Sequence, residues 1–297
     1  MTTVGRRGLN EVRWASNRQV LYDAEGPGDP GVLKRIDVMT RTVWRIGPVD
    51  EVPAGGLYFN LSANRSLLAL TTRCLGACKP HTYVEVGIAG ASGGAVRQLP
   101  HSPGDDEQDA SFSPDGKEVV FARGATTISH RAGEAYDELF VESTAGGPAR
   151  DLGYDGWGPT FSPDGRWIAF ITAGEVAPGV SKLIVAIIPA DAGKSRFIGL
   201  RRPAPIGLAR ADMFTWAPHS DTIAYATNQD TGYLGTVDVT GHRHQFDLGG
   251  IRYINHTPQW SPDGTQIAFT GVPLTGKGLR NGIYVIGTDG RGMRRLA

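Results

Sequence analysis

Short runs in which apolar residues alternate with polar or small ones recur along the chain, and the clearest of them follow the same turn. The run Trp167-Ile-Ala-Phe-Ile171 is rich in β-branched and aromatic residues, which is typical of a half-buried strand. It follows the phrase Phe161-Ser-Pro-Asp-Gly165. There proline presets φ for the first corner of a tight turn, aspartate can bond the backbone two residues on, and glycine takes the positive φ that closes the turn. The pattern therefore predicts two antiparallel strands joined by this turn.

The turn and the strand after it occur six times. Aligned on the residue that opens the turn, the copies begin near residues 14, 61, 112, 161, 216 and 260, which are 44 to 55 residues apart. Phe112-Ser-Pro-Asp-Gly116 and Trp260-Ser-Pro-Asp-Gly264 are full copies, Trp216-Ala-Pro-His-Ser220 is degenerate, and the first two copies are weak. An interval of roughly 40 to 50 residues is typical of the blades of a β-propeller.

Each unit also contains a third apolar strand and a turn that leads to a short fourth strand. The third strands are predicted at residues 32–38, 83–88, 138–142, 183–188, 233–239 and 283–287. In the last unit Thr288-Asp-Gly-Arg-Gly292 leads to a fourth strand at 293–296. The sequence thus predicts an all-β fold in which residues 1–297 form one six-bladed β-propeller domain with four antiparallel strands per blade.

The turn followed by an apolar strand, together with the hairpin at 283–296, resembles the TolB-type, WD-repeat-like β-propeller repeat. The resemblance implies a six-bladed propeller that acts as a recognition module. TolB carries an additional N-terminal α/β domain, whereas about thirteen residues precede the first turn here. We therefore expect only the propeller part of that family and no role in the Tol system.

Charge and hydrophobicity limit the kinds of partner and the cellular compartment that we expect for this protein. The 30 basic residues balance 30 acidic ones, so no global field attracts nucleic acid or an anionic membrane. No stretch reaches eighteen uninterrupted apolar residues, and the first seven lack the apolar core of a signal peptide. As written, we expect a soluble, monomeric, cytoplasmic protein without membrane insertion, or an extracytoplasmic one if a leader has been removed.

The two cysteines, Cys74 and Cys78, lie close together in a predicted loop with a glycine between them. A local disulfide would favour an oxidising compartment, while two free thiols would fit the cytosol. A structural zinc site is not expected, because one cysteine pair supplies half of the ligands.

The loops at the end of each blade away from the repeated turns are longer and more varied, and binding sites concentrate on such loops. The residues just ahead of each turn should approach the mouth of the central channel on this face. The ligand-binding candidates are Glu11, Arg13, Tyr58, Asp109, Trp157, Arg210, Asp212 and His256.

Two interpretations of these residues remain open. Glu11, Asp109, Asp212 and His256 could together hold a divalent cation such as calcium, or supply a general acid and base. Alternatively, the channel is filled with water and its carboxylates are satisfied by backbone amides or by arginines such as Arg13 and Arg210. Trp157 is flanked by Gly156 and Gly158, which could present its ring for stacking or let it plug the channel.

Other groups carry weaker signals. The pair His242 and His244 could bind metal from one side of a strand but lacks a third ligand nearby. The acidic run Asp105-Asp106-Glu107 could bind a cation or serve as a solubilising surface.

The sequence leaves two functions open. Motifs for a serine nucleophile, for phosphate binding, for zinc proteases and for dinucleotides are absent. We therefore expect a module that binds a protein, peptide or small-molecule ligand at the channel mouth. The alternative is a lyase, hydrolase or isomerase with a site built from several blades and a divalent cation.

Two ways of closing the propeller ring also remain open. The ring closes either by packing between blades alone or by residues 2–8 adding an edge strand to the last blade.

Overall fold

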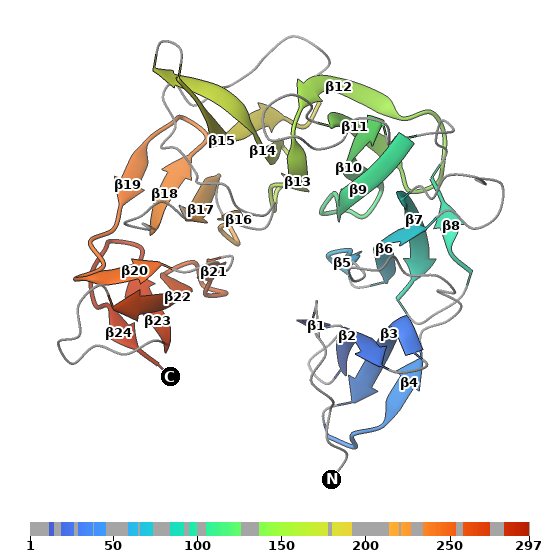
Figure 1. Cartoon of the computed structure of the whole chain (residues 1–297), viewed down its shortest axis with the longest axis horizontal. Helices are drawn as coiled ribbons and strands as arrows, with labels where there is room; N and C mark the ends of the chain where they lie inside the picture. Colours follow the sequence, from blue (N-terminus) through green and yellow to red (C-terminus); the bar gives the residue numbers. More distant parts are fainter. Residues whose placement is uncertain are drawn as a thin grey trace. The chain divides into compact units, whose positions relative to one another are not determined.

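The computed structural model describes sixteen segments of the chain: residues 12–14, 19–26, 29–37, 39–45, 59–64, 66–73, 84–91, 95–99, 105–125, 137–177, 180–191, 214–219, 221–226, 234–253, 258–273 and 282–296. The described residues contain strands and turns and no helix (Figure 1). Accordingly, they include no helix that could span a membrane. The strand pairs whose register is described are antiparallel. The prediction of an all-β fold is confirmed.

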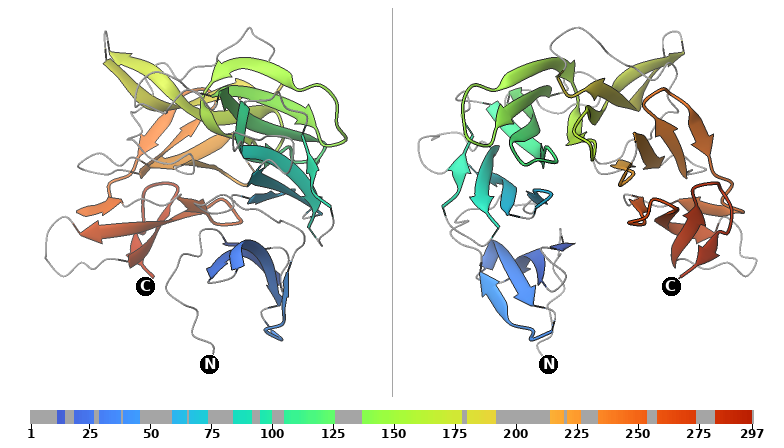
Figure 2. Two further views of the ribbon diagram at one scale, coloured as in Figure 1. Left: turned by 45° about the vertical axis from the view of Figure 1, so that its right-hand side comes forward. Right: turned by 180° about the vertical axis from the view of Figure 1, so that it is seen from behind.

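The chain divides into two compact units, residues 1–160 and 161–297. The first unit contains three four-stranded sheets in which each strand pairs with the next along the chain (Figure 2). Their strands are β1 (Val12–Trp14), β2 (Gln19–Gly26), β3 (Asp29–Asp37) and β4 (Val43–Arg45); β5 (Phe59–Leu61), β6 (Leu67–Arg73), β7 (Val84–Gly90) and β8 (Arg97–Gln98); and β9 (Asp105–Phe112), β10 (Glu118–Ala125), β11 (Glu138–Ser143) and β12 (Arg150–Asp155).

A further three-stranded sheet begins at the boundary of the units, and the second unit adds two more sheets. The strands of these sheets are β13 (Trp157–Phe161), β14 (Trp167–Ala177) and β15 (Val180–Pro189); β16 (Phe214–Trp216), β17 (Thr222–Ala226), β18 (Leu234–Asp238) and β19 (Arg243–Gln245); and β20 (Ile251–Tyr253), β21 (Gln259–Trp260), β22 (Gln266–Pro273), β23 (Gly282–Gly287) and β24 (Arg294–Arg295). In the last sheet both β20 and β21 pair with β22.

The predicted third strands are found as β3, β7, β11, β15, β18 and β23. The predicted fourth strand at 293–296 is found as β24. Four strands are described in most sheets, but residues 192–213, which follow β15, lie outside the described residues. The arrangement of the sheets as six blades of one ring, and its closure by residues 2–8, stay predictions.

The repeated turn has the chemistry that the sequence predicts. In the copy at 112–116 the Ser113 hydroxyl donates to Asp115 Oδ1 at 2.7 Å, and the Lys117 backbone N–H donates to the same oxygen at 3.0 Å. Gly116 has a φ of 71°, which an L side chain rarely adopts. The Ser113 hydroxyl also accepts the Glu118 backbone N–H at 2.9 Å, so it fixes the start of the next strand.

The core of each unit lies between neighbouring sheets. In the first unit, Val86 and Ile88 of β7 pack with Phe112, Val119 and Phe121 of β9 and β10. In the second unit, the sheets β16–β19 and β20–β24 share a cluster whose buried members are Ala224, Ala226, Leu234, Phe246, Leu248, Ile251, Ile267, Phe269, Tyr284 and Ile286. Burial of such side chains between sheets is the dominant stabilising contribution to a fold of this kind.

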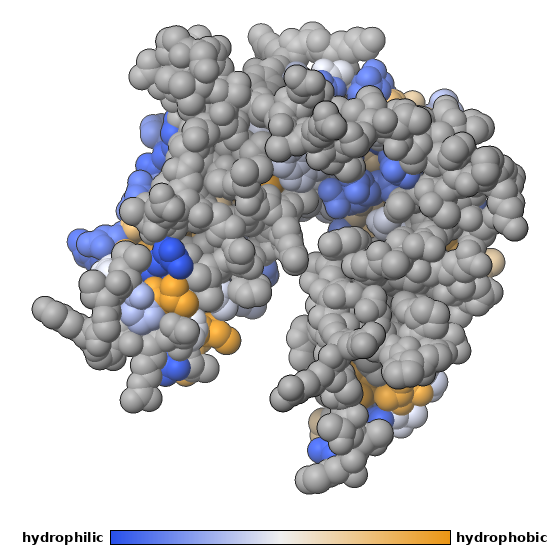
Figure 3. Space-filling view, in the orientation of Figure 1, coloured by the Kyte–Doolittle hydropathy of each residue, from blue (hydrophilic) through white to orange (hydrophobic). Residues whose placement is uncertain are grey.

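Apolar surface remains exposed on the edge strand of the first sheet. Met39, Val43 and Trp44 are exposed at and next to β4, and hydrophobic surface is visible in that region in Figure 3. The guanidinium carbon of Arg35 lies 5.2 Å from the Trp44 ring centroid, which covers part of the ring.

Candidate functional site

Neighbouring sheets are joined by polar contacts between their first strands. Asn60 of β5 donates through Nδ2 to the carbonyl of Ala110 in β9 at 2.7 Å. In the second unit, the Trp260 indole N–H of β21 donates to the carbonyl of Thr215 in β16 at 3.1 Å. Side chains next to the repeated turns thus link the first strands of neighbouring sheets within each unit.

A β-bulge positions Asp109. Ser111 pairs with Val120 and Gln108 pairs with Ala122, so three steps along β9 match two along β10. Asp109 occupies the bulge with a φ of 58°, a left-handed conformation that aspartate tolerates better than most residues. The Asp109 carboxylate reaches β13, where its Oδ2 accepts the backbone N–H of Gly158 at 3.1 Å.

Trp157 is held on both sides by backbone hydrogen bonds. Gly158 donates to Asp109, and the backbone N–H of Gly156 donates to the carbonyl of Asp137 at 2.8 Å. The Asp137 carboxylate accepts from Gln108 Nε2 at 2.6 Å. The Trp157 side chain is half-buried. The backbone on either side of it is hydrogen-bonded, to β9 through Gly158 and to Asp137, just before β11, through Gly156. We call Gln108, Asp109, Asp137 and Trp157 the Trp157 cluster.

Gly124 is required beside this cluster. A Cβ atom added at Gly124 of β10 would collide with the Asp137 carboxylate. The missing side chain lets Asp137 approach the sheet closely enough to meet Gln108.

The acidic run at the start of β9 does not act as a simple solubilising surface. Glu107 is fully buried, and Arg123 binds its Oε1 through Nη2 at 2.7 Å and through Nε at 3.0 Å. The Arg123 guanidinium carbon lies 4.4 Å from the Phe140 ring centroid. A buried pair of this kind, with two N–H donors on one carboxylate oxygen and an aromatic ring over the guanidinium, fixes β9, β10 and β11 against one another within their sheet. Glu107 is thus a structural residue.

The neighbouring carboxylates make the outer part of this region acidic. Asp155, at the end of β12, has its pKa raised by burial and by the nearby negative charge of Asp151. Such a shift indicates that the carboxylates lie close enough to destabilise one another when ionised. A positive charge brought to this region would be favoured.

Most other predicted site residues lie outside the part of the chain that the structure describes. This holds for Glu11, Tyr58, Arg210, Asp212, His256, Cys74 and Cys78, and for the Arg13 side chain. Of the shortlist, the structure therefore describes the side chains of Asp109 and Trp157, and it brings their segments together. Among the described residues no three His, Cys, Asp or Glu side chains gather as a metal site would require.

The side chains of His242 and His244 have different neighbours. His242 lies in the turn before β19, where its Nδ1 is 2.9 Å from the Thr240 hydroxyl and 3.5 Å from Asp238 Oδ2. His244 lies within β19 and packs against Phe246, with ring centroids 5.0 Å apart.

Sequence reasoning missed one member of the Trp157 cluster, Asp137. It directly precedes the predicted third strand at 138–142, and that end of β11 lies at the same end of the sheet as the start of β9, with the end of β10 between them. The position of Asp137 directly before a predicted third strand could therefore have marked it as a candidate site residue.

Comparison with known proteins supports the fold. No protein-family model matches the chain. Dipeptidyl-peptidase 5 from Porphyromonas gingivalis is 26% identical over 176 residues, which are 56% of this chain and 23% of the peptidase. TolB from Acinetobacter baumannii matches with a TM-score of 0.54 and 19% identity, over 82% of this chain and 56% of TolB. An oligogalacturonate lyase in complex with manganese matches with a TM-score of 0.65 and 12% identity, over 94% of this chain and 74% of the lyase.

These similarities show a β-propeller fold of the kind found in TolB and in enzymes with unrelated chemistries. The chain spans about a quarter of the curated peptidase and little more than half of TolB. Because one fold serves both binding proteins and enzymes, the function has to be argued from the site.

Proposed function

We propose that this protein is a six-bladed β-propeller that binds a protein or peptide on the loop face carrying the Trp157 cluster. The observation that supports the proposal most strongly is the anchoring of Trp157 between two hydrogen-bonded glycines, beside the carboxylates of Asp109 and Asp137. Aromatic side chains held on a rigid scaffold dominate recognition surfaces, because they bury a large area with little loss of conformational freedom.

The chemistry of the cluster favours a cationic segment of the partner. An indole ring attracts a Lys or Arg side chain through its π face, and a carboxylate beside the ring adds charge attraction. The closeness of Asp151 and Asp155 strengthens this preference. In a six-bladed ring, Glu11, Tyr58, Arg210, Asp212 and His256 would extend the same surface.

Binding of short labelled peptides tests the proposal. The probes are fluorescein-labelled (Gly-Arg)4 and (Gly-Glu)4, and the readout is fluorescence anisotropy at low salt. We expect the arginine peptide to bind, and Trp157→Ala and Asp109→Asn each to weaken it by about tenfold, which corresponds to about 1.4 kcal/mol. Asparagine tolerates the left-handed φ and still accepts the Gly158 N–H, so the second variant removes the charge alone.

Two variants in the same unit serve as controls. Trp44→Ala removes an exposed indole from β4, and Asp115→Asn removes a carboxylate from the repeated turn while its oxygen still accepts the Lys117 N–H. Neither should change the affinity more than about twofold. Equal binding of both peptides, or unchanged affinity in Trp157→Ala, would contradict the proposal.

The alternative, an enzyme that uses a divalent cation, rests on the predicted convergence of Glu11, Asp109, Asp212 and His256. Thermal melts with calcium, manganese or EDTA test it, since a specific ligand of the native state raises its stability. A recognition module without a resident ion should melt at the same temperature in all three. A rise of several degrees with one metal, lost in Asp109→Asn, would support the enzyme instead.

A further inference from the structure

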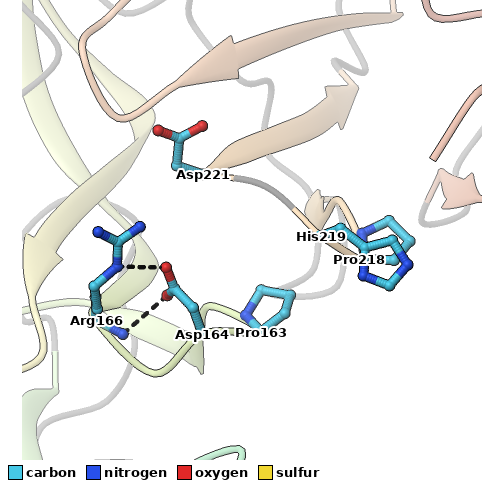
Figure 4. Close-up of a pocket in the computed structure, with 6 residues that line it drawn as sticks. All are labelled: Pro163, Asp164, Arg166, Pro218, His219 and Asp221. Atoms are coloured by element: carbon cyan, nitrogen blue, oxygen red, sulfur yellow. Dashed lines mark hydrogen bonds and ion pairs between the residues drawn. The ribbon is translucent and has the colours of Figure 1, made fainter. Parts of the chain in front are cut away.

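A hollow of about 500 Å³ lies on two consecutive copies of the repeated turn in the second unit (Figure 4). It is lined by the third, fourth and sixth residues of each copy. These residues are Pro163, Asp164 and Arg166 from one turn and Pro218, His219 and Asp221 from the other. The volume falls within the range of small-molecule sites, roughly 300 to 1,000 Å³.

The first of these turns uses its polar side chains to close itself. The Ser162 hydroxyl donates to Asp164 Oδ1 at 2.6 Å, and the backbone N–H of Arg166 donates to the same oxygen at 3.0 Å. Arg166 Nε donates to Asp164 Oδ2 at 2.5 Å. This set of bonds fixes the carboxylate and holds the arginine stem over the turn.

The second turn lacks this side-chain closure. Ala217 and His219 stand where other copies have serine and an acidic or amide residue, and the backbone bond from Ala217 N–H to Thr222 O, at 2.8 Å, forms without them. Within the part of the chain that the structure describes, neither the His219 ring nor the Asp221 carboxylate has a hydrogen-bond or ion-pair partner. Both side chains are therefore available at the hollow.

Opposite charges stand at equivalent positions of the two turns without pairing. Arg166 and Asp221 both follow the fifth residue of their copies, and no ion pair joins them among the described contacts (Figure 4). The two terminal nitrogens of the guanidinium carry four N–H donors besides the Nε–H that Asp164 uses. The ionised Asp221 carboxylate is an acceptor only.

We propose that this hollow binds a small zwitterion, a molecule with a carboxylate and an ammonium group such as the free ends of a short peptide. The ligand carboxylate pairs with the terminal nitrogens of Arg166, and the ligand ammonium group pairs with Asp221. His219 and the rings of Pro163 and Pro218 form the walls between them. The site is independent of the Trp157 cluster, since it shares no residue with it.

Titration with triglycine, followed by calorimetry or by NMR, tests the proposal on the intact chain. We expect a dissociation constant in the millimolar range, because the hollow is open and the charges remain partly hydrated. N-acetyl-triglycine lacks the ammonium group and triglycine amide lacks the carboxylate, so each should bind at least about tenfold more weakly. Glycine as a further probe distinguishes a free amino acid from a peptide as the source of the zwitterion.

Single substitutions test which side chain binds the carboxylate of the ligand and which binds its ammonium group. Arg166→Gln should remove the preference for triglycine over its amide, and Asp221→Asn should remove the preference over the N-acetyl form. Lys117→Gln, at the equivalent position of the turn between β9 and β10, should change neither. A thermal melt of each variant confirms folding. Absence of triglycine binding at 50 mM, which is about fifty times a dissociation constant of 1 mM, would overturn the proposal. So would equal binding of the blocked peptides.

Discussion

Glu142 of β11 has a buried carboxyl group in the core of the first unit. Its side chain is 1% exposed, and neither carboxylate oxygen has a hydrogen-bond partner among the described residues. Burial raises the pKa of Glu142 to about 7, and the negative charge of Glu107 adds to the rise. Arg97 and Arg123 act in the opposite direction and do not compensate. The protonated form is therefore favoured in the folded protein.

This environment predicts stability that falls with rising pH. A raised pKa in the folded state means that the stabilising contribution is fully present below the unfolded value of 4.5 and is lost as the pH rises through about 7. The free energy of unfolding should fall by about 2.5 kcal/mol between pH 5 and pH 8, because the pKa rises from 4.5 to about 7 and each pKa unit corresponds to about 1.4 kcal/mol. Urea unfolding at both pH values measures this fall.

Glu142→Gln should abolish most of this pH dependence, because glutamine does not ionise. Glu138→Gln, an exposed position on the same strand, is the matched control and should keep the wild-type dependence. If Glu142→Gln and the wild type lose the same stability between the two pH values, the carboxyl group is not buried as described.

Asp109 allows a second test at the scale of the residue, because its left-handed backbone conformation and its side-chain hydrogen bond to Gly158 affect stability separately. Asp109→Gly should lose the bond to Gly158 but relieve the left-handed φ, whereas Asp109→Ala loses the bond and keeps the strain. The alanine variant should therefore be less stable than the glycine variant by about 1 kcal/mol. Equal midpoints of chemical unfolding would show that the bulge is absent.

At the scale of the element, the repeated turn shows how far a five-residue sequence motif can specify a hairpin. In the described copies with serine at the second position and Asp or Asn at the fourth, the serine hydroxyl donates to the fourth residue, as Ser62 does to Asn64 at 2.8 Å and Ser261 to Asp263 at 2.5 Å. The pKa of Asp263 is lowered mainly by the hydrogen bond from Ser261. The copy that begins at Trp216 keeps the backbone bond from the Ala217 N–H to the Thr222 carbonyl without the side-chain bond.

Restoring the serine and the aspartate of the repeated turn in the copy that begins at Trp216 should stabilise that copy. The double substitution Ala217→Ser with His219→Asp recreates the serine-to-acid bond and should raise the free energy of unfolding by about 1 kcal/mol. Ser162→Ala should have the opposite effect, because it removes the bonds to Asp164 and from the Trp167 N–H. Differential scanning calorimetry measures both. A stabilising effect of Ala217→Ser alone would point to a different origin of the gain.

At the scale of the whole molecule, the proposed six-bladed ring predicts how the protein unfolds. A six-bladed ring couples every sheet to two neighbours, so it should unfold in one cooperative transition. We expect the calorimetric and van't Hoff enthalpies to agree within about 10%, as for a two-state domain. Two resolved transitions, one for each unit, would contradict a closed ring. Deleting residues 1–8 distinguishes the modes of closure, since a large loss of stability rejects closure by packing alone.

The sequence by itself determined the elements of this protein. Local turn chemistry and strand periodicity depend on residues a few positions apart, so the hairpins and the third strands were predictable within three residues. Asp109 and Trp157 were predictable as candidates because both precede a repeated turn and are unusual there.

Only the tertiary structure decided which of these residues meet. The hydrogen bond from Gly158 to Asp109, the burial of Glu107 and Glu142 between sheets, and the hollow between two turns all depend on the register and packing of segments far apart in the chain. A repeat pattern contains no information on such pairings, since identical units leave open how one sheet is placed on the next. The physical reason is that packing and charge are set by neighbours in space, whereas turns and strands are set by neighbours in sequence.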